Sequence, residues 1–164
     1  MPPAAPRAPR KKKFICEVFM KDLIERIRRL TDAALPLCSN LANTAAALNA
    51  IPDLNWCGFY LAEGETLYVG PFQGEPACAA IAFGKGVCGT AAVRKESVTV
   101  DDVAAFPGHI ACSSRSRSEL VVPILREGRV LGVIDLDSPD YARFDPALRE
   151  AIEEIAKILA PLFP

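Results

Sequence analysis

Residues 120–137 read LVVPILREGRVLGVIDLD and carry the clearest β signal in the chain. Two apolar runs, at 120–125 and 130–137, flank an Arg-Glu-Gly-Arg sequence that has the composition of a hairpin turn. Successive residues of a strand point to opposite faces, so Asp135 and Asp137 share one face and the apolar residues between them share the other. The second run therefore predicts a strand with one apolar face and one acidic face.

The register of this hairpin decides which residues lie beside the two aspartates. A two-residue turn would place Leu120 opposite Asp135, which sets an apolar side chain against a carboxylate. A three-residue loop, or an equivalent bulge near Pro123, instead places Glu119 opposite Asp137. A bulge or an edge position is expected at this proline for a second reason, because proline cannot donate to a strand ladder. We therefore predict that three carboxylates converge on one surface.

The segments around the hairpin complete an order of helix, helix, strands and helix. Apolar residues three to four apart predict a first helix over 14–35, ended by Pro36, and a second helix capped by Ser39. Asp145-Pro146 begins a last helix, whose apolar stripe follows at helical spacing over 148–159. Short apolar or β-branched runs predict further strands at 56–61, 67–69, 77–83 and 98–100.

Strands in the middle of the chain and helices at its ends predict an α+β fold. The N- and C-terminal helices would cover one face of a central antiparallel or mixed sheet, and the acidic face would be left for a ligand pocket. A length of 164 residues with 51% hydrophobic residues is enough for a single domain, which we place at 14–164. Residues 1–13, with four prolines and a basic run, are predicted to form a disordered arm.

The overall composition excludes some classes of partner. A net charge of -1 and a pI near 5.9 provide no cationic field to neutralise nucleic-acid phosphates or anionic lipids. The N-terminal segment has no apolar stretch that resembles a signal peptide or a membrane span. We therefore expect no nucleic-acid partner, no membrane association and a cytoplasmic location.

Six cysteines without a secretory signal are interpreted as free thiols: Cys16, Cys38, Cys57, Cys78, Cys88 and Cys112. No two have the spacing of a structural zinc site, and His109 is the only histidine, so such a site is not expected. The last three cysteines lie in segments rich in turn-forming residues, where thiols can meet without disturbing a core. The first three lie in predicted helices or a strand, where a cysteine is usually a small buried residue.

Two groups of residues suggest chemistry. Converging carboxylates repel one another, which raises at least one pKa or calls for a cation such as a ligand ammonium; solvated charges at strand ends are the alternative. Cys112 has His109, Arg115 and Arg117 nearby in sequence, and any of these could favour its thiolate form. His109 could also act as a catalytic base, although a lone histidine is more often a loop or packing residue.

Several segments, in order, resemble the free methionine-(R)-sulfoxide reductases, which are GAF domains. They are NWCGFYL at 55–61, VGPFQG at 69–74, GVCGTA at 86–91, FPGHIAC at 106–112, SE at 118–119 and GVIDLDS at 132–138. The resemblance runs from about Asn40 to the C-terminus. It implies that Cys112 is the nucleophile, that Cys88 and Cys78 are resolving cysteines, that Glu119, Asp135 and Asp137 are the active-site carboxylates, and that Trp56 and Tyr60 line the pocket. Cys57 departs from the family pattern and suggests a side disulfide near the pocket.

The chemistry implied by the resemblance needs no metal, flavin or nucleotide. A protonated carboxyl donates to the sulfoxide oxygen, the thiolate attacks sulfur, and a second thiol converts the resulting sulfenic acid to a disulfide. The expected partners are free methionine sulfoxide and a thioredoxin-like reductant, and a homodimer is left open. The alternatives are a GAF module that binds a small ligand without turning it over, and a dithiol redox sensor.

Overall fold

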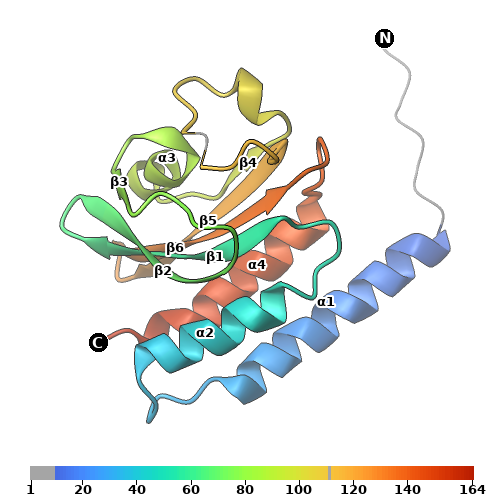
Figure 1. Ribbon diagram of the computed structural model, residues 1–164. Coiled ribbons are helices and arrows are strands. Elements are labelled where there is room, and N and C mark those ends of the chain that lie inside the picture. Colours follow the sequence, from blue (N-terminus) through green and yellow to red (C-terminus); the bar gives the residue numbers. More distant parts are fainter. Residues whose placement is uncertain (1–9, 111) are drawn as a thin grey trace.

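The computed structural model describes residues 10–110 and 112–164, with side chains from Glu17 onward (Figure 1). The chain begins with two helices, α1 (Arg10–Leu30) and α2 (Leu37–Leu48). Five strands and one helix follow: β1 (Trp56–Glu63), β2 (Thr66–Gly74), β3 (Ala80–Ala82), α3 (Gly86–Arg94), β4 (Val98–Val100) and β5 (Ser118–Arg126). The strand β6 (Arg129–Ser138) and the helix α4 (Pro146–Leu159) complete the fold, with short 3₁₀ turns at Val103–Ala105 and Ala160–Leu162.

The strands form one sheet in the order β3-β2-β1-β6-β5-β4, and neighbouring strands are antiparallel throughout the described sheet. Helices α1, α2 and α4 lie together on one face of this sheet, while α3 lies on the other (Figure 1). The predicted α+β fold, with terminal helices on one face, is confirmed. No helix in the described part of the chain is long and apolar enough to cross a membrane.

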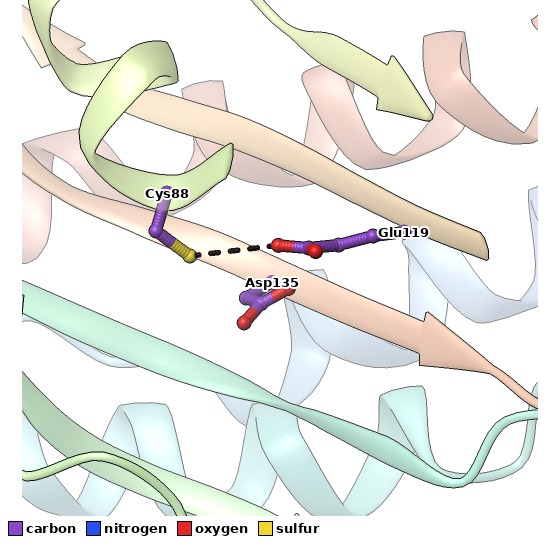
Figure 2. Close-up of side chains that lie close together, drawn as sticks. All are labelled: Cys88, Glu119 and Asp135. Atoms are coloured by element: carbon purple, nitrogen blue, oxygen red, sulfur yellow. Dashed lines mark hydrogen bonds between the residues drawn. The ribbon is translucent and has the colours of Figure 1, made fainter. Parts of the chain in front are cut away.

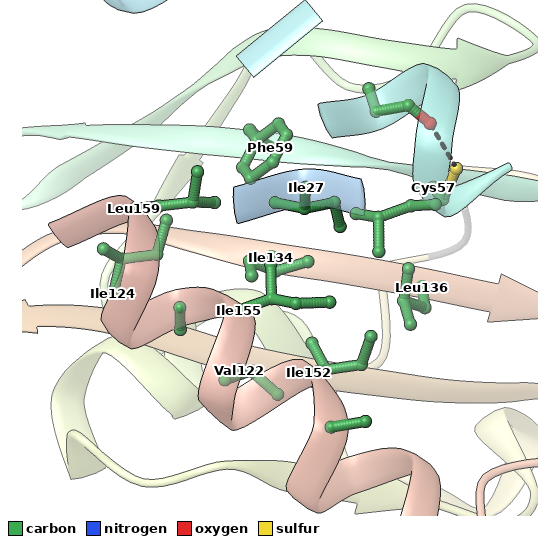
Figure 3. Packing of buried hydrophobic residues seen from close by; sticks show 14 of the residues in the cluster. Ile27, Cys57, Phe59, Val122, Ile124, Ile134, Leu136, Ile152, Ile155 and Leu159 are labelled. Atoms are coloured by element: carbon green, nitrogen blue, oxygen red, sulfur yellow. Dashed lines mark hydrogen bonds between the residues drawn. The ribbon is translucent and has the colours of Figure 1, made fainter. Parts of the chain in front are cut away.

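The main core lies between the sheet and the three helices. Alternate residues of the central strands, including Ile134 and Leu136 of β6, point into it and are fully buried. They pack against Ile27 of α1 and against Ile152 and Ile155 of α4 (Figure 3). The residues between them on β6 therefore point to the opposite face, as the period of a strand requires.

The hairpin has the predicted register, and of the two alternatives that would produce it, a bulge is present and the three-residue loop is not. Glu119 lies opposite Asp137, as expected. The turn has only two residues, Glu127 and Gly128, with φ of 52° and 75°, and positive φ at both positions is typical of the tight turn that suits twisted strands. The register is restored by a bulge in β6, where Leu131 has no partner because Ile124 pairs with Gly132 and Leu125 with Val130.

Some predicted element boundaries are wrong. The helix α1 begins at Arg10, within the arm predicted over 1–13, while residues 1–9 lie outside the described part. It ends at Leu30 and not near Pro36, because the side-chain amide of Asn40 bonds to the backbone N and O of Asp32 at 2.9 Å and fixes a turn there. Helix α2 starts at Leu37 without a side-chain cap, so Ser39 lies inside it.

Two predictions nearer the pocket also need correction. The strand predicted over 77–83 contracts to Ala80–Ala82, which leaves Cys78 in a loop. Residues 86–94 form the helix α3, which was not predicted, and Cys88 lies in this helix and not in a loop. The last helix begins as predicted, since the carboxylate of Asp145 accepts a hydrogen bond from the Leu148 N–H at 2.8 Å.

Candidate active site

A pocket opens on the face of the sheet opposite the three packed helices. Strands β1, β5 and β6 form its floor, α3 forms one side, and the loops before β3 and β5 cover it. Its lining includes seven of the eight residues predicted for the site: Trp56, Tyr60, Cys88, Cys112, Glu119, Asp135 and Asp137. The eighth, Cys78, lies in the loop before β3 and follows the lining residue Ala77 in the sequence.

The three acidic side chains, named the carboxyl cluster below, come from adjacent strands. Glu119 of β5 and Asp135 of β6 are each only 6% exposed. Burial, followed by repulsion from neighbouring carboxylates, raises the pKa of both well above the ordinary values. Burial also raises the pKa of Asp137, but hydrogen bonding from Ser116 and the charge of His109 limit the rise to about 6. Burial and crowding therefore favour the protonated forms of Glu119 and Asp135, whereas Asp137, with a pKa of about 6, is largely ionised at neutral pH.

Cys88 lies against this cluster (Figure 2). Its thiol points from α3 toward the Glu119 carboxyl, with 4.0 Å between Sγ and Oε1. Burial and the charges of the neighbouring carboxylates raise the pKa of Cys88 well above its ordinary value. Helix α3 reaches the sheet this closely because Gly89 has no side chain: a Cβ there would lie 2.4 Å from the carbonyl oxygen of Ala82.

The other two thiols lie in the loops that cover the pocket. Cys112 is exposed as a residue, yet partial burial of its thiol in the pocket is the largest cause that raises its pKa to about 12, and the Cys78 side chain comes next. The expectation that basic neighbours favour the Cys112 thiolate is therefore wrong for the substrate-free protein. Arg115 pairs instead with Glu75 at 3.5 Å on the surface, and His109 Nε2 lies 3.5 Å from Glu119 Oε2.

Two aromatic residues of β1 connect the sheet to the loop that carries Cys78. Trp56 stacks between Tyr60 and Phe72, with ring centroids 5.9 and 5.2 Å apart. Its indole N–H donates to the backbone carbonyl of Glu75 at 3.1 Å, and the Tyr60 hydroxyl donates to that of Cys78 at 3.1 Å. The aromatic pair thus lines the pocket and also fixes the position of the loop thiol.

Comparison with known proteins agrees with this geometry. A model of the GAF domain matches residues 36–161. The free methionine-R-sulfoxide reductase of Saccharomyces cerevisiae is 43% identical over 152 residues, which cover 87% of this chain and 84% of the yeast protein. That of Escherichia coli is 42% identical over 147 residues, covering 87% and 89%.

The chain belongs to the free methionine-R-sulfoxide reductase family of GAF domains. Among solved structures, the Neisseria meningitidis free methionine-R-sulfoxide reductase in complex with its substrate is similar, with a TM-score of 0.85 and 40% identity. The alignment covers 99% of this chain and 96% of that one. The likeness therefore includes all strands and helices around the pocket.

In this member of the free methionine-R-sulfoxide reductase family, the sequence assigned no role to the pocket residue Asn55, and it associated His109 with a different group from the one that His109 contacts. Asn55 donates from its amide to the Ser116 hydroxyl at 3.1 Å, and Ser116 hydrogen-bonds to Asp137. His109 contacts the carboxyl cluster and not the thiol that follows it in sequence. Asn55 lies in the family segment at 55–61 and His109 in the segment at 106–112. Their place in these segments was the available sign in the sequence that they belong to the pocket.

Cys57 and Cys38 do not line the pocket of this family member. Cys57 is fully buried on the helix side of the sheet, where its thiol donates to the carbonyl of Ala45 at 3.6 Å. Its predicted structural role is confirmed, but a side disulfide near the pocket is wrong, because its side chain is on the other face. Cys38 is exposed and not buried as expected. The side chain of Cys16 lies outside the described residues.

Proposed function

We infer that this protein reduces free L-methionine-(R)-sulfoxide to methionine, with Cys112 as the nucleophile. The observation that carries this inference is that Cys112, the carboxyl cluster and Trp56 line the same pocket. Sulfoxide reduction needs an acid at the oxygen and a thiol at the sulfur, and this pocket offers both. Membership of the free methionine-R-sulfoxide reductase family supports the same substrate.

The carboxyl cluster offers a binding site for the ammonium of a free amino acid. With a pKa near 6, Asp137 is mostly ionised at neutral pH and can pair with that ammonium. Trp56, stacked and 5% exposed, offers an apolar surface to the methyl and methylene groups of the substrate. A peptide-bound methionine sulfoxide has an uncharged amide nitrogen in place of the ammonium, so the pocket should select the free amino acid.

Protonated Glu119 or Asp135 supplies the acid. One of them donates a proton to the sulfoxide oxygen, which makes the sulfur electrophilic as the Cys112 sulfur attacks it. The oxygen moves to Cys112 as a hydroxyl group, methionine leaves, and the thiol proton restores the carboxyl. The sulfoxide is thereby reduced by two electrons and Cys112 is oxidised by two electrons to a sulfenic acid.

Binding of the substrate also explains how a thiol with a pKa of about 12 becomes reactive. Burial is the largest cause of that high pKa in the substrate-free pocket. A bound ammonium adds a positive charge to the pocket, and a nearby positive charge lowers the pKa of a thiol. The nucleophile is therefore activated mainly when the correct substrate is present.

Cys78 is the first resolving cysteine in this proposal. The Cys78 side chain is one of the causes that raise the pKa of Cys112, so the two thiols are neighbours, and both residues belong to loops. Its thiol attacks the sulfenic acid of Cys112, forms the Cys78–Cys112 disulfide and releases water. Cys88 is buried in α3 beside Glu119, so it would have to leave the carboxyl cluster to compete for the same reaction. It remains the alternative resolving thiol.

An external dithiol must then reduce the disulfide by exchange, and a thioredoxin-like protein is the partner proposed for this step. Such a cycle fits the reducing cytoplasm, which is the location we propose. It needs no metal, flavin or nucleotide. A homodimer is compatible with the proposal, but no step of the reaction requires a second subunit.

The decisive experiment measures turnover of free L-methionine-(R)-sulfoxide with dithiothreitol as the reductant. Cys112→Ser should abolish turnover, whereas Cys38→Ser is a matched control on the exposed surface of α2 and should retain it. Substantial turnover by Cys112→Ser would show that another thiol attacks. Binding without turnover would favour the GAF ligand sensor, and oxidation of the protein without release of methionine would favour the redox sensor.

A further inference from the structure

One group of side chains in the pocket has donor atoms suited to a metal ion. The thiol of Cys88 and one carboxylate oxygen each from Glu119 and Asp135 lie within 4.8 Å of one another. They come from α3, β5 and β6 and point toward one another (Figure 2). All three residues are buried, so the arrangement differs from the exposed acidic groups that are common on protein surfaces.

The hydrogen bonding of this group is incomplete. Asp135 Oδ1 is buried and has no hydrogen-bond partner among the described residues. A buried polar oxygen without a hydrogen-bond partner costs free energy. Such an oxygen in a native protein calls for an explanation, and a bound ion is one. Asp135 lies directly beside Cys88 and Glu119, so a cation bound between the three would have this incompletely bonded carboxylate as a ligand (Figure 2).

We propose that the reduced protein binds Zn²⁺ through Cys88 Sγ and one carboxylate oxygen each from Glu119 and Asp135. Sulfur favours zinc over magnesium or calcium, which prefer oxygen ligands alone. Zinc binds both thiolate and carboxylate at about 2.0–2.3 Å, so small side-chain rotations would close this group around the ion. Three protein ligands with a fourth position open to the pocket is the arrangement of an accessible zinc site and not of a closed structural one.

The site has a consequence for activity that rests on the proposed function. Glu119 and Asp135 are the groups proposed to protonate the sulfoxide. They lie beside Asp137, which is proposed to bind the ammonium. A divalent cation bound by Glu119 and Asp135 would take the place of the proton that they donate to the sulfoxide. It would also repel the substrate ammonium and keep the Cys88 thiol bound. Zinc is therefore expected to inhibit reversibly, in competition with the substrate.

Cobalt substitution gives a readout that does not depend on turnover. Co²⁺ bound to a thiolate produces a charge-transfer band in the near ultraviolet, and tetrahedral Co²⁺ has intense visible bands. The background for the test is the reduced Cys78→Ser/Cys112→Ser full-length protein, in which the loop thiols cannot bind the metal. We expect both signals in this background, and addition of Zn²⁺ should displace Co²⁺ and remove them.

The matched variant adds Cys88→Ser to the same background. The charge-transfer band should disappear and zinc affinity should fall by at least about 100-fold, because losing even an outer-shell partner of a metal ligand costs about 10–100-fold. Glu119→Gln, which keeps the shape of the side chain, should weaken zinc binding while circular dichroism confirms the fold. Retention of the band without Cys88, or its absence from the background protein, would overturn the proposal.

A competition experiment separates this site from the proposed function. In the cobalt-loaded background protein, free L-methionine at saturating concentration should reduce the charge-transfer band, while N-acetyl-methionine should not. In the parent protein, Zn²⁺ should inhibit turnover and a chelator should restore it. If the protein proves to have no reductase activity, the cobalt spectra still decide whether the metal site exists; full activity with zinc bound would refute the competition.

Discussion

Asp137→Asn is predicted to make the protein more stable and less active. Burial raises the pKa of Asp137 from its ordinary 3.8 to about 6 in the folded protein. A group whose folded pKa is raised destabilises the fold once it ionises, so stability should fall as pH rises from about 4 to about 6. The rise in pKa corresponds to about 3 kcal/mol. Asparagine cannot ionise, so the variant should gain up to that amount at pH 7 and little at pH 4.

Activity should change in the opposite direction, because the ionised form is the one proposed to bind the ammonium. For the parent protein, kcat/KM should fall about tenfold per pH unit below pH 6 as Asp137 becomes protonated. The variant should lack this dependence. At pH 7 its kcat/KM for free L-methionine-(R)-sulfoxide should be lower by at least about 100-fold, since leaving a buried charge without its partner costs about 3 kcal/mol or more.

The assay pairs two substrates with one stability measurement. Turnover of free L-methionine-(R)-sulfoxide is compared with turnover of its N-acetyl form, and urea unfolding is followed at pH 4 and pH 7. The parent protein should strongly prefer the free amino acid, and Asp137→Asn should lose most of that preference. Equal rates of the parent on both substrates would refute ammonium binding by the carboxyl cluster. Unchanged stability at pH 7 would refute the electrostatic cost assigned to Asp137.

Three further outcomes are expected. Peptide mapping of protein oxidised by one equivalent of substrate should identify a disulfide from Cys112 to Cys78, and a bridge to Cys88 alone would contradict the assignment of the resolving thiol. Tyr60→Phe removes the hydrogen bond to the Cys78 carbonyl, so single-turnover experiments should show methionine release at the parent rate and slower disulfide formation; equal slowing of both would indicate a general packing defect. Ile134→Ala, in the core under the sheet, should lower the free energy of unfolding by about 2–5 kcal/mol in denaturant titrations, and a loss under 1 kcal/mol would contradict its full burial.

The strand pattern was sufficient to predict the register of the β5–β6 hairpin but not its turn. Alternation placed Asp135 and Asp137 on one face, and pairing with Glu119 followed once an extra residue was allowed. The position of that residue could not be deduced, because Leu131 is an apolar residue within an apolar run and leaves no break in the pattern. Sequence reasoning therefore left a longer loop and a bulge near Pro123 as equal alternatives, and the structure has a two-residue turn with a bulge in β6, opposite Ile124 and Leu125.

Helix α3 could not be predicted because its residues have little helical signal of their own. The segment GVCGTAAVR contains two glycines and two β-branched valines, which are more typical of turns or strands. Its position depends on tertiary contact, since Gly89 packs directly on the Ala82 carbonyl. The error mattered for the site, because it made Cys88 a mobile loop thiol in the prediction when it is a buried neighbour of Glu119.

The sequence predicted which side chains lie in the pocket better than it predicted which of them contact one another. Carboxylates on strands were placed by the period of two, whereas loop residues have no such period. His109 and Arg115 are close to Cys112 in sequence, but their charged groups contact Glu119 and Glu75. The side chain that affects the pKa of Cys112 most is Cys78, in the loop before β3 and more than thirty residues earlier.

The stability of this fold and the chemistry of its site arise on opposite faces of the same strand. Ile134 and Leu136 of β6 bury apolar side chains against the helices, while Asp135 between them buries a carboxyl that raises its own pKa. Apolar burial of this kind contributes about 1.5–3 kcal/mol for each large side chain, which can offset the cost of a crowded acidic cluster. The strand keeps the carboxyls close together, and their mutual repulsion adds to burial in raising the pKa of Glu119 and Asp135. In the proposed function a substrate ammonium relieves this repulsion on binding, and only a free amino acid carries that ammonium.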